Sequence, residues 1–201
     1  PEEHIRALNE KPELLKSCGR PAIDTQVEIR DENDNPLPIG EIGQICAKGP
    51  QIMKGYWNKK EESEKALKGG WMHTGDAGRM DEEGFVFIQD RIKDMIVSGG
   101  ENIYSTEVEA ALFAHPDVVD AAVIGVPDEK YGEVVKACIV KKEGSNVTED
   151  DLISFCKDRI ASYKKPQSVD FIDEVPRNAS GKVLKKVLRE PYWKDQERQV
   201  S

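Results

Sequence analysis

The chain has 201 residues, which is enough for one large domain or two small ones. Its formal net charge is -9 and 33% of its residues are charged, which argues against a general nucleic-acid binder with a basic face. No apolar run approaches the ~20 residues of a membrane-spanning helix, and we expect no signal peptide.

The cysteines and histidines are scattered along the chain. They are Cys18, Cys46, Cys138 and Cys156, with His4, His73 and His115. No two of the cysteines form a C-x-x-C pair. We therefore expect reduced thiols in a cytoplasmic protein, and no metal bound by this chain itself.

The first half of the chain alternates between apolar and polar residues, which predicts mainly strands and hairpins. A proline and two acidic residues open a short helix before them. The expected elements are a helix with a connector at 1–18, strands at 26–31 and 41–49, a polar helix at 58–67, and a strand pair within 69–90.

After Asp90 the pattern changes to mixed α/β. Two glycines, Gly99 and Gly100, predict a tight hairpin, and capping boxes are expected at Thr106 and Thr148. The expected elements are helices at 107–115, 150–162 and 182–193, and strands at 118–126, 133–142 and 168–173. The change predicts an α+β chain with a boundary near Asp90–Arg91, between domains 1–91 and 92–201.

Four short segments carry chemistry, and each alone has an ordinary explanation. Thr74–Asp76 and Ser98–Asn102 fit turns, while Asp90–Asp94 fits a solvated run of charges. Ser180–Lys182 suggests a phosphate-binding P-loop at first sight. That interpretation fails, because the pattern needs glycine at position 176 and a hydroxyl at position 183, where Pro and Val stand.

Together and in this order, the segments resemble the C-terminal portion of an AMP-forming acyl-CoA synthetase of the adenylate-forming superfamily. The matching stretches are GEIGQICAKGPQIMKGYWN (40–58), GWMHTGD (70–76), DRIKDMIVSGGENIYSTEVE (90–109) and VPRNASGKVLKKVLRE (175–190). The resemblance covers essentially the whole chain and is most similar to fatty-acyl-CoA ligases. Ser105 and Ala179 depart from the usual prolines, and neither change removes an expected functional group.

The resemblance implies two half-reactions. A carboxylate attacks the α-phosphate of ATP to give an acyl adenylate and diphosphate, and the thiol of coenzyme A then displaces AMP. Lys182 is the implied catalytic residue, because a positioned cation stabilises the transition state in which two anions meet. Lys182 would also contact ATP or AMP, with Asp76 accepting hydrogen bonds from the ribose hydroxyls and Arg91 holding the same nucleotide.

The resemblance also implies a mobile C-terminal lobe. Lys93 and Asp94 match the family hinge, and Gly99 and Gly100 would line the path of coenzyme A. The loop that holds the ATP phosphates and the motif that binds adenine and Mg²⁺ lie upstream of Pro1 in the family. We therefore expect residues 1–91 to be the β-rich end of an N-terminal AMP-binding domain, with Mg²⁺ bound mainly outside this chain.

The sequence thus predicts a fragment of an ATP-dependent acyl-CoA synthetase, with medium- or long-chain fatty acids favoured. Its expected partners are ATP, a carboxylic acid and coenzyme A, and not nucleic acid. Two alternatives stay open: an aryl or short-chain acid ligase of the same family, and a standalone interaction module without turnover. The acid, the oligomeric state, contact of the longer protein with a membrane surface, and whether the 201 residues are a natural product are left undecided.

Overall fold

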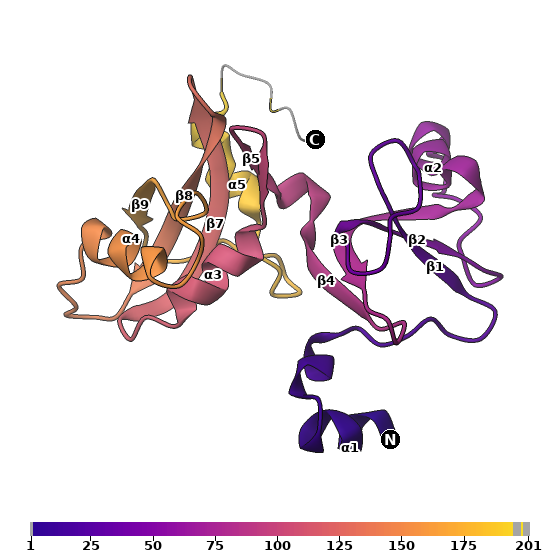
Figure 1. Ribbon diagram of the computed structural model, residues 1–201. Coiled ribbons are helices and arrows are strands. Elements are labelled where there is room, and N and C mark those ends of the chain that lie inside the picture. The colour runs from indigo at the N-terminus through magenta and orange to yellow at the C-terminus, as the bar shows by residue number, and fades with distance from the viewer. Residues whose placement is uncertain (1, 195–197, 199–201) are drawn as a thin grey trace. The chain divides into compact units, whose positions relative to one another are not determined.

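The computed structural model describes residues 2–194 and 198, and Figure 1 shows how they are arranged in each part of the chain. The chain divides into a first unit, Pro1–Ile92, and a second unit, Lys93–Ser201. Each unit has its own sheet and its own buried cluster of apolar side chains, so each is described by itself.

The first unit is a four-stranded antiparallel sheet whose strands follow one another in chain order. This confirms the predicted hairpins, and the short helices also fall where they are expected. The elements are α1 (Glu2–Asn9), β1 (Gln26–Arg30), β2 (Gly43–Lys48), α2 (Lys60–Ala66), β3 (Met72–Met80) and β4 (Val86–Arg91). The sheet places residues of β2 and β4 on either side of β3.

The second unit has a five-stranded sheet in the order β6-β5-β8-β7, with β9 pairing parallel to β8. Its strands are β5 (Ile96–Ser98), β6 (Glu101–Ile103), β7 (Val118–Asp128), β8 (Gly132–Lys141) and β9 (Ser168–Phe171), and its helices are α3 (Ser105–Phe113), α4 (Glu149–Lys157) and α5 (Lys185–Arg189). The long β7–β8 hairpin is its central feature.

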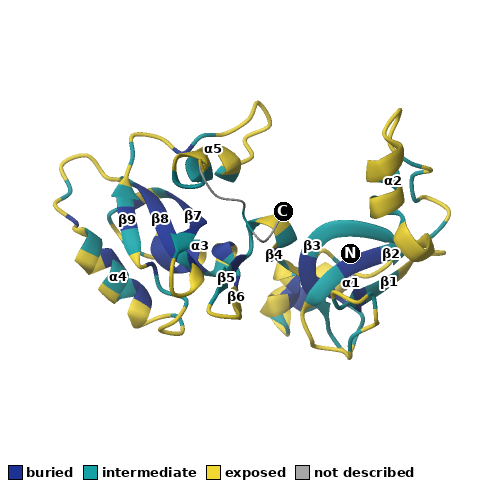
Figure 2. Ribbon diagram, turned by 90° about the horizontal axis from the view of Figure 1, so that it is seen from above, coloured by how far each residue is buried: buried dark blue, intermediate teal, exposed yellow. Residues whose placement is uncertain are grey.

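Both faces of the β7–β8 hairpin are covered, which Figure 2 shows as dark strands between partly exposed helices. Side chains alternate along a strand, so successive residues serve opposite faces. Val123 belongs to the larger core with Leu112 of α3 and Leu152 of α4. Ile124 belongs to a second cluster, which Leu188 of α5 packs against. Burial on both faces explains why these strands read as continuous apolar runs.

Two predictions about helix starts are wrong. Helix α3 begins at Ser105, one residue before the expected cap Thr106, and it has no side-chain cap hydrogen bond. Glu109, the expected partner in that capping box, instead accepts a hydrogen bond from the Val123 amide at 2.9 Å. The last helix begins at Lys185 and not at Lys182, because the residues before it form a hairpin.

The capping box at Thr148 is confirmed. The Thr148 side chain accepts a hydrogen bond from the amide of Asp151, and the Asp151 carboxylate accepts one from the amide of Thr148. In the part of the chain that the structure describes, no helix is long and apolar enough to cross a membrane.

Candidate functional site

Asp76 and Arg91 are neighbours across the β3–β4 pair of the first unit. Arg91 Nε lies 3.5 Å from Asp76 Oδ1, and the two side chains are 45% and 28% exposed. The ionised carboxylate is an acceptor-only group, and it remains partly open to solvent. The pair can therefore accept hydrogen bonds from a diol and offer a cation to a phosphate or base.

The backbone around Asp76 is shaped by its two predecessors. The Thr74 hydroxyl donates to the Ile45 carbonyl at 2.8 Å and accepts from the Asp76 amide at 3.1 Å. Gly75 has a φ of 76°, a conformation that glycine adopts without a steric penalty. The Thr-Gly-Asp sequence therefore holds the backbone of Asp76 in place beside β2.

Lys182 lies in a hairpin of the second unit that spans residues 177–183. Asn178 organises its tip: its side-chain oxygen accepts hydrogen bonds from the Ser180 amide, the Ser180 hydroxyl and the Lys182 amide at 3.1, 2.8 and 2.9 Å. Gly181, with a φ of 81°, completes the turn. The backbone of Lys182 is therefore held by side-chain contacts while Lys182 itself is exposed.

Arg177 anchors this hairpin to β7. Its guanidinium donates to the Gly181 carbonyl at 3.0 Å and to both carboxylate oxygens of Asp120 at 3.0 and 2.8 Å. Nη2 makes both contacts with Asp120 and Nη1 makes the contact with Gly181, so one guanidinium joins the hairpin tip to β7. Sequence reasoning missed Arg177 and Asp120, because they are 57 residues apart.

The side chain of nearby Lys185 is already engaged in an ion pair and a hydrogen bond. Its ammonium lies 2.7 Å from Glu109 Oε1, and it donates to the Ser105 hydroxyl at 2.5 Å. The Lys185 and Glu109 side chains are only 10% and 17% exposed. Lys185 therefore joins α5 to α3, and Ser105 has a contact that the proline usual at this position could not make. Lys182 differs from Lys185 in its exposure, which suits a lysine that reaches a ligand.

Gly99 and Gly100 form the turn between β5 and β6, with φ angles of 59° and 88°. Both angles are positive, as a tight two-residue hairpin requires. A Cβ on Gly99 would lie 3.2 Å from the Tyr131 ring, whereas one on Gly100 would meet nothing within 4 Å. Backbone geometry alone accounts for both glycines, so their contact with coenzyme A stays a prediction.

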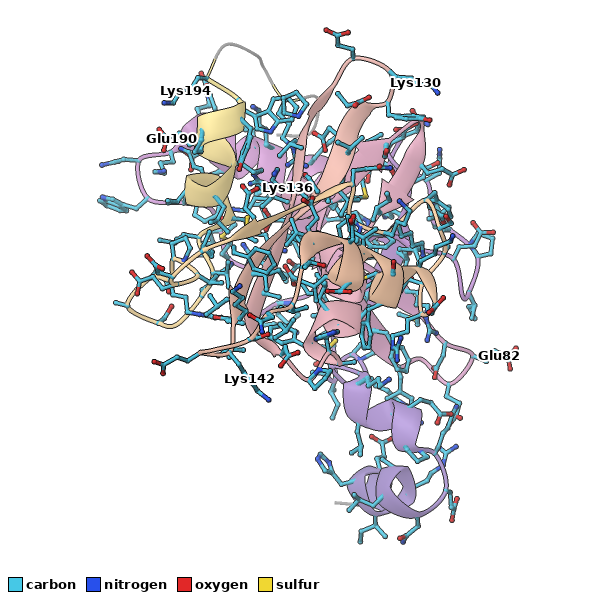
Figure 3. The ribbon with its side chains drawn as sticks, turned by 90° about the vertical axis from the view of Figure 1, so that its left-hand side faces the viewer. Glu82, Lys130, Lys136, Lys142, Glu190 and Lys194 are labelled. Atoms are coloured by element: carbon cyan, nitrogen blue, oxygen red, sulfur yellow. The ribbon has the colours of Figure 1, made fainter. Side chains whose placement is uncertain are left out.

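The glycine turn and the lysine hairpin lie at opposite ends of the β7–β8 ribbon. Gly99 donates to the Tyr131 carbonyl beside the β7–β8 turn, and Asp120 anchors the hairpin near the start of β7. Figure 3 labels a residue at either end, Lys130 at the turn and Lys142 just beyond β8. Asp120 and Asp128, the last residue of β7, are eight residue steps apart along the strand, a length of roughly 26 Å.

The expected hinge residues Lys93 and Asp94 lie in a 3-10 turn that two arginines hold. Arg189 lies 3.1 Å from Asp94 Oδ1 and donates to the Lys93 carbonyl at 3.1 Å. Arg198 donates to the same carbonyl at 2.5 Å and pairs with Glu133 at 2.6 Å. Burial and the nearby charge of Arg198 lower the pKa of Arg189, which Asp94 opposes. This clamp could not be predicted from the sequence, because Arg189 lies 96 residues from Lys93 and Arg198 lies 105 residues from it.

The predicted site residues thus fall into separate groups. Asp76 and Arg91 belong to the first unit, whereas Lys182 and the Gly99–Gly100 turn belong to the second. The structure brings the first two together and keeps Lys182 and the glycines at different ends of one ribbon.

Two family models match this chain, one within the first unit and one within the second. Residues 4–57 match the family described as AMP-binding enzyme, and residues 107–182 match the AMP-binding enzyme C-terminal domain. Lys182 is the last residue of the second match.

Similar proteins include ligases that act on different acids. The chain is 44% identical over 180 residues to a feruloyl-CoA synthase of Amycolatopsis sp, covering 90% of this chain and 37% of that protein. It is also 44% identical over 174 residues to a long-chain-fatty-acid–CoA ligase of Escherichia coli O6:H1, covering 87% and 31%. The chain therefore spans about a third of the length of the curated relatives it matches.

Among solved structures, one similar chain is the o-succinylbenzoate CoA synthetase of Bacillus subtilis in complex with its acyl-adenylate intermediate. It is 36% identical with a TM-score of 0.82, covering 98% of this chain and 38% of that chain. The likeness therefore extends over both units.

Proposed function

Since this chain belongs to the AMP-binding enzyme family, whose AMP-forming acyl-CoA synthetases it resembles, we propose that it works within a longer acid–thiol ligase. That ligase converts a carboxylic acid, ATP and coenzyme A into an acyl-CoA, AMP and diphosphate through an acyl adenylate. The observation that carries the proposal is the exposed Lys182 on a hairpin that Asn178 and the Arg177–Asp120 pair hold rigid.

In the first half-reaction, a carboxylate oxygen of the acid forms a bond to the α-phosphorus of ATP as the bond to diphosphate breaks. Lys182 approaches these anionic oxygens with its ammonium and lowers the barrier as their charges converge. Asp76 accepts hydrogen bonds from the ribose hydroxyls, and Arg91 holds the nucleotide from the adjacent strand. At ~4 Å and an effective dielectric near 20, one such charge contact is worth about 4 kcal/mol.

In the second half-reaction, the sulfur of coenzyme A attacks the acyl carbonyl carbon, the thiol proton is released, and AMP leaves. The Gly99–Gly100 turn presents backbone without side chains along the path of the thiol. Because this turn and Lys182 lie at opposite ends of one ribbon, the second unit must turn between the two steps, with Lys93 and Asp94 as the pivot. Mg²⁺ supplies charge neutralisation on the ATP phosphates, and residues outside this chain are expected to hold it.

Fatty acids of medium or long chain are our first choice of substrate, supported by the fatty-acid ligase among the relatives. An aryl acid is the alternative that the feruloyl-CoA synthase favours. We assign no residue of this chain to the recognition of a fatty acid over an aryl acid. A cytoplasmic location stays a prediction from the sequence.

The test is substitution of Lys182 in the full-length protein. Lys182→Ala should slow acid-dependent diphosphate release about 1,000-fold, which corresponds to about 4 kcal/mol of lost stabilisation. Lys186→Ala, a change at an exposed lysine of α5, is the matched control and should retain full activity. Equal losses in the two variants would reject the assignment.

The isolated 201-residue chain should make no acyl-CoA. It offers Lys182, Asp76 and Arg91, but the orientation that accelerates the reaction needs the ATP and acid sites expected upstream. Acid-dependent AMP formation by the purified chain would contradict this expectation. Absence of turnover together with loss of AMP formation in the full-length Lys182→Ala variant would support the ligase.

A further inference from the structure

Three potential metal ligands, none of which the proposed reaction uses, gather at the sheet of the first unit. Cys46 on β2 lies directly opposite His73 on β3, and Asp34 lies in the connection between β1 and β2. Their donor atoms all lie within 4.8 Å of one another. Cys46 is fully buried, and the side chains of His73 and Asp34 are only 13% and 18% exposed. The group is therefore built into the fold and largely shielded from solvent.

The His73 ring is oriented by Gln44. Its Nδ1 lies 2.7 Å from the side-chain oxygen of Gln44, which can only accept a hydrogen bond. Nδ1 therefore donates to Gln44, and Cys46 Sγ lies 3.5 Å from the same ring nitrogen. Among the residues that the structure describes, His73 Nε2 is the only buried side-chain nitrogen or oxygen atom without a hydrogen-bond partner. Such an orphan in a folded protein calls for an explanation.

An oxygen of the Asp34 carboxylate lies near His73 Nε2. His73 Nε2 lies 3.6 Å from Asp34 Oδ1, too far for a hydrogen bond. Yet 3.6 Å is close to the ~3.4 Å expected between nitrogen and oxygen ligands that share one tetrahedral zinc ion, given metal–ligand bonds of ~2.1 Å. Asp34 Oδ1 already accepts a hydrogen bond from Arg30 at 3.3 Å, so a cation between the two atoms would chiefly give Nε2 the partner that it lacks.

We propose that Asp34, Cys46 and His73 bind a zinc-type divalent metal ion through a carboxylate oxygen, Sγ and Nε2. Gln44 would be the outer partner that orients a metal-bound histidine through its other ring nitrogen. Thiolate, imidazole and carboxylate are together a ligand set that suits zinc, with a fourth position open to water. This site departs from the expectation, drawn from the scattered histidines and cysteines, that the chain binds no metal.

The surrounding charges allow the site but limit its affinity. Arg30 lies 3.3 Å from Asp34 Oδ1, and its own charge is offset by Glu28 at 2.8 Å. Lys68 lies 3.9 Å from the other Asp34 oxygen, but its side chain is 64% exposed and can withdraw into solvent. Burial raises the pKa of the Cys46 thiol to about 11, so the metal must displace that proton as the sulfur–metal bond forms.

The site would serve the first unit as a cross-link. Bound metal would join the Asp34 connection to β2 and β3, and would add to the Asp34–Arg30 contact with β1, the Asp34–His73 contact with β3 and the hydrogen bond from Gly40 to Met80. The inference is independent of the ligase reaction, because neither Asp76 nor Arg91 takes part.

Cobalt(II) titration of the 201-residue chain tests the proposal directly. The Cys18→Ser background removes the one exposed thiol. One equivalent of cobalt should produce a thiolate-to-metal charge-transfer band, and zinc should abolish the band by displacement. The band should be lost in Cys46→Ser, and His73→Gln and Asp34→Asn should each weaken cobalt binding at least tenfold.

Cys156→Ser is the matched control, since Cys156 is as fully buried but lies in the second unit. It should bind cobalt like the background chain. In parallel, zinc should raise the unfolding midpoint of the background chain and leave that of His73→Gln unchanged, which provides a readout if Cys46→Ser does not fold. No charge-transfer band in the folded background chain, or an equal zinc shift in His73→Gln, would overturn the site.

Discussion

At the scale of single residues, two lysines that look equivalent in the sequence differ in their exposure to solvent and in the groups that they contact. Lys185 is committed to Glu109 and Ser105, whereas Lys182 is exposed at a hairpin whose backbone is fixed. The resemblance to the acyl-CoA synthetases was enough to predict Lys182 as the catalytic residue from the sequence. The residues that position it could not be named, because Asp120 is distant in sequence and Asn178 looks like an ordinary turn residue.

Asn178 provides the sharpest residue-scale prediction. Asn178→Ala removes an oxygen that accepts three hydrogen bonds within the hairpin. We expect the adenylation rate of the full-length protein to fall about tenfold, equivalent to about 1.4 kcal/mol of lost positioning. Asn178→Asp keeps the acceptor and should restore most of the rate, which diphosphate release would measure. Full activity of the alanine variant would mean that the hairpin does not position Lys182.

At the scale of elements, most strands could be predicted because each carries its own alternation or apolar run. The helix starts were harder. Thr148 caps α4 as expected, but the similar pattern at Thr106 is overridden because Glu109 bonds to β7 and α5 instead. A local pattern cannot reveal a partner that only the tertiary fold supplies.

Also at the scale of elements, ion pairs whose strength depends on pH attach helix α1 and the connector after it to Glu83. Glu83 pairs with Arg6 and Lys11, and hydrogen bonds from them lower the pKa of Glu83 to about 2. A carboxylate with a lowered pKa stabilises the fold above its unfolded pKa of about 4.5 and loses that contribution as the pH falls through about 2.

The docking of α1 should therefore weaken between about pH 4.5 and pH 2. Amide hydrogen exchange in residues 2–9 should accelerate over this range relative to that in β3. Glu83→Gln should show fast exchange already at neutral pH. A pH profile that Glu83→Gln leaves unaltered would show that the ion pairs do not hold the helix.

At the scale of the whole molecule, the two units meet in sequence at Ile92–Lys93, beside exposed trypsin sites at Arg91 and Lys93. The second unit holds a core of its own from α3, α4 and the sheet, within the size range of independently stable domains. Trypsin should therefore cut first near these two residues and leave the second unit folded. Simultaneous loss of both units would contradict a hinge here.

The arginine clamp should set how fast that cut occurs. Arg189→Met removes one donor to the Lys93 carbonyl and the partner of Asp94. We expect cleavage after Lys93 to accelerate about fivefold, since one charged hydrogen bond is worth about 1 kcal/mol or more. Lys186→Met, on the same helix, should cleave at the original rate. Equal rates in both variants would show that the clamp does not restrain the turn.

We propose that the two ends of the second unit serve different half-reactions. Measuring both half-reactions of the full-length protein in paired variants tests this most directly. Lys182→Ala should slow diphosphate release about 1,000-fold and spare thioester formation from preformed acyl adenylate, and Gly100→Leu should do the reverse. Gly144→Leu controls for backbone strain, because Gly144 also has a positive φ, 75° against 88° at Gly100, and open space around it. Loss of both half-reactions to the same degree in the Lys182 and Gly100 variants would contradict the assignment of the two ends to two steps.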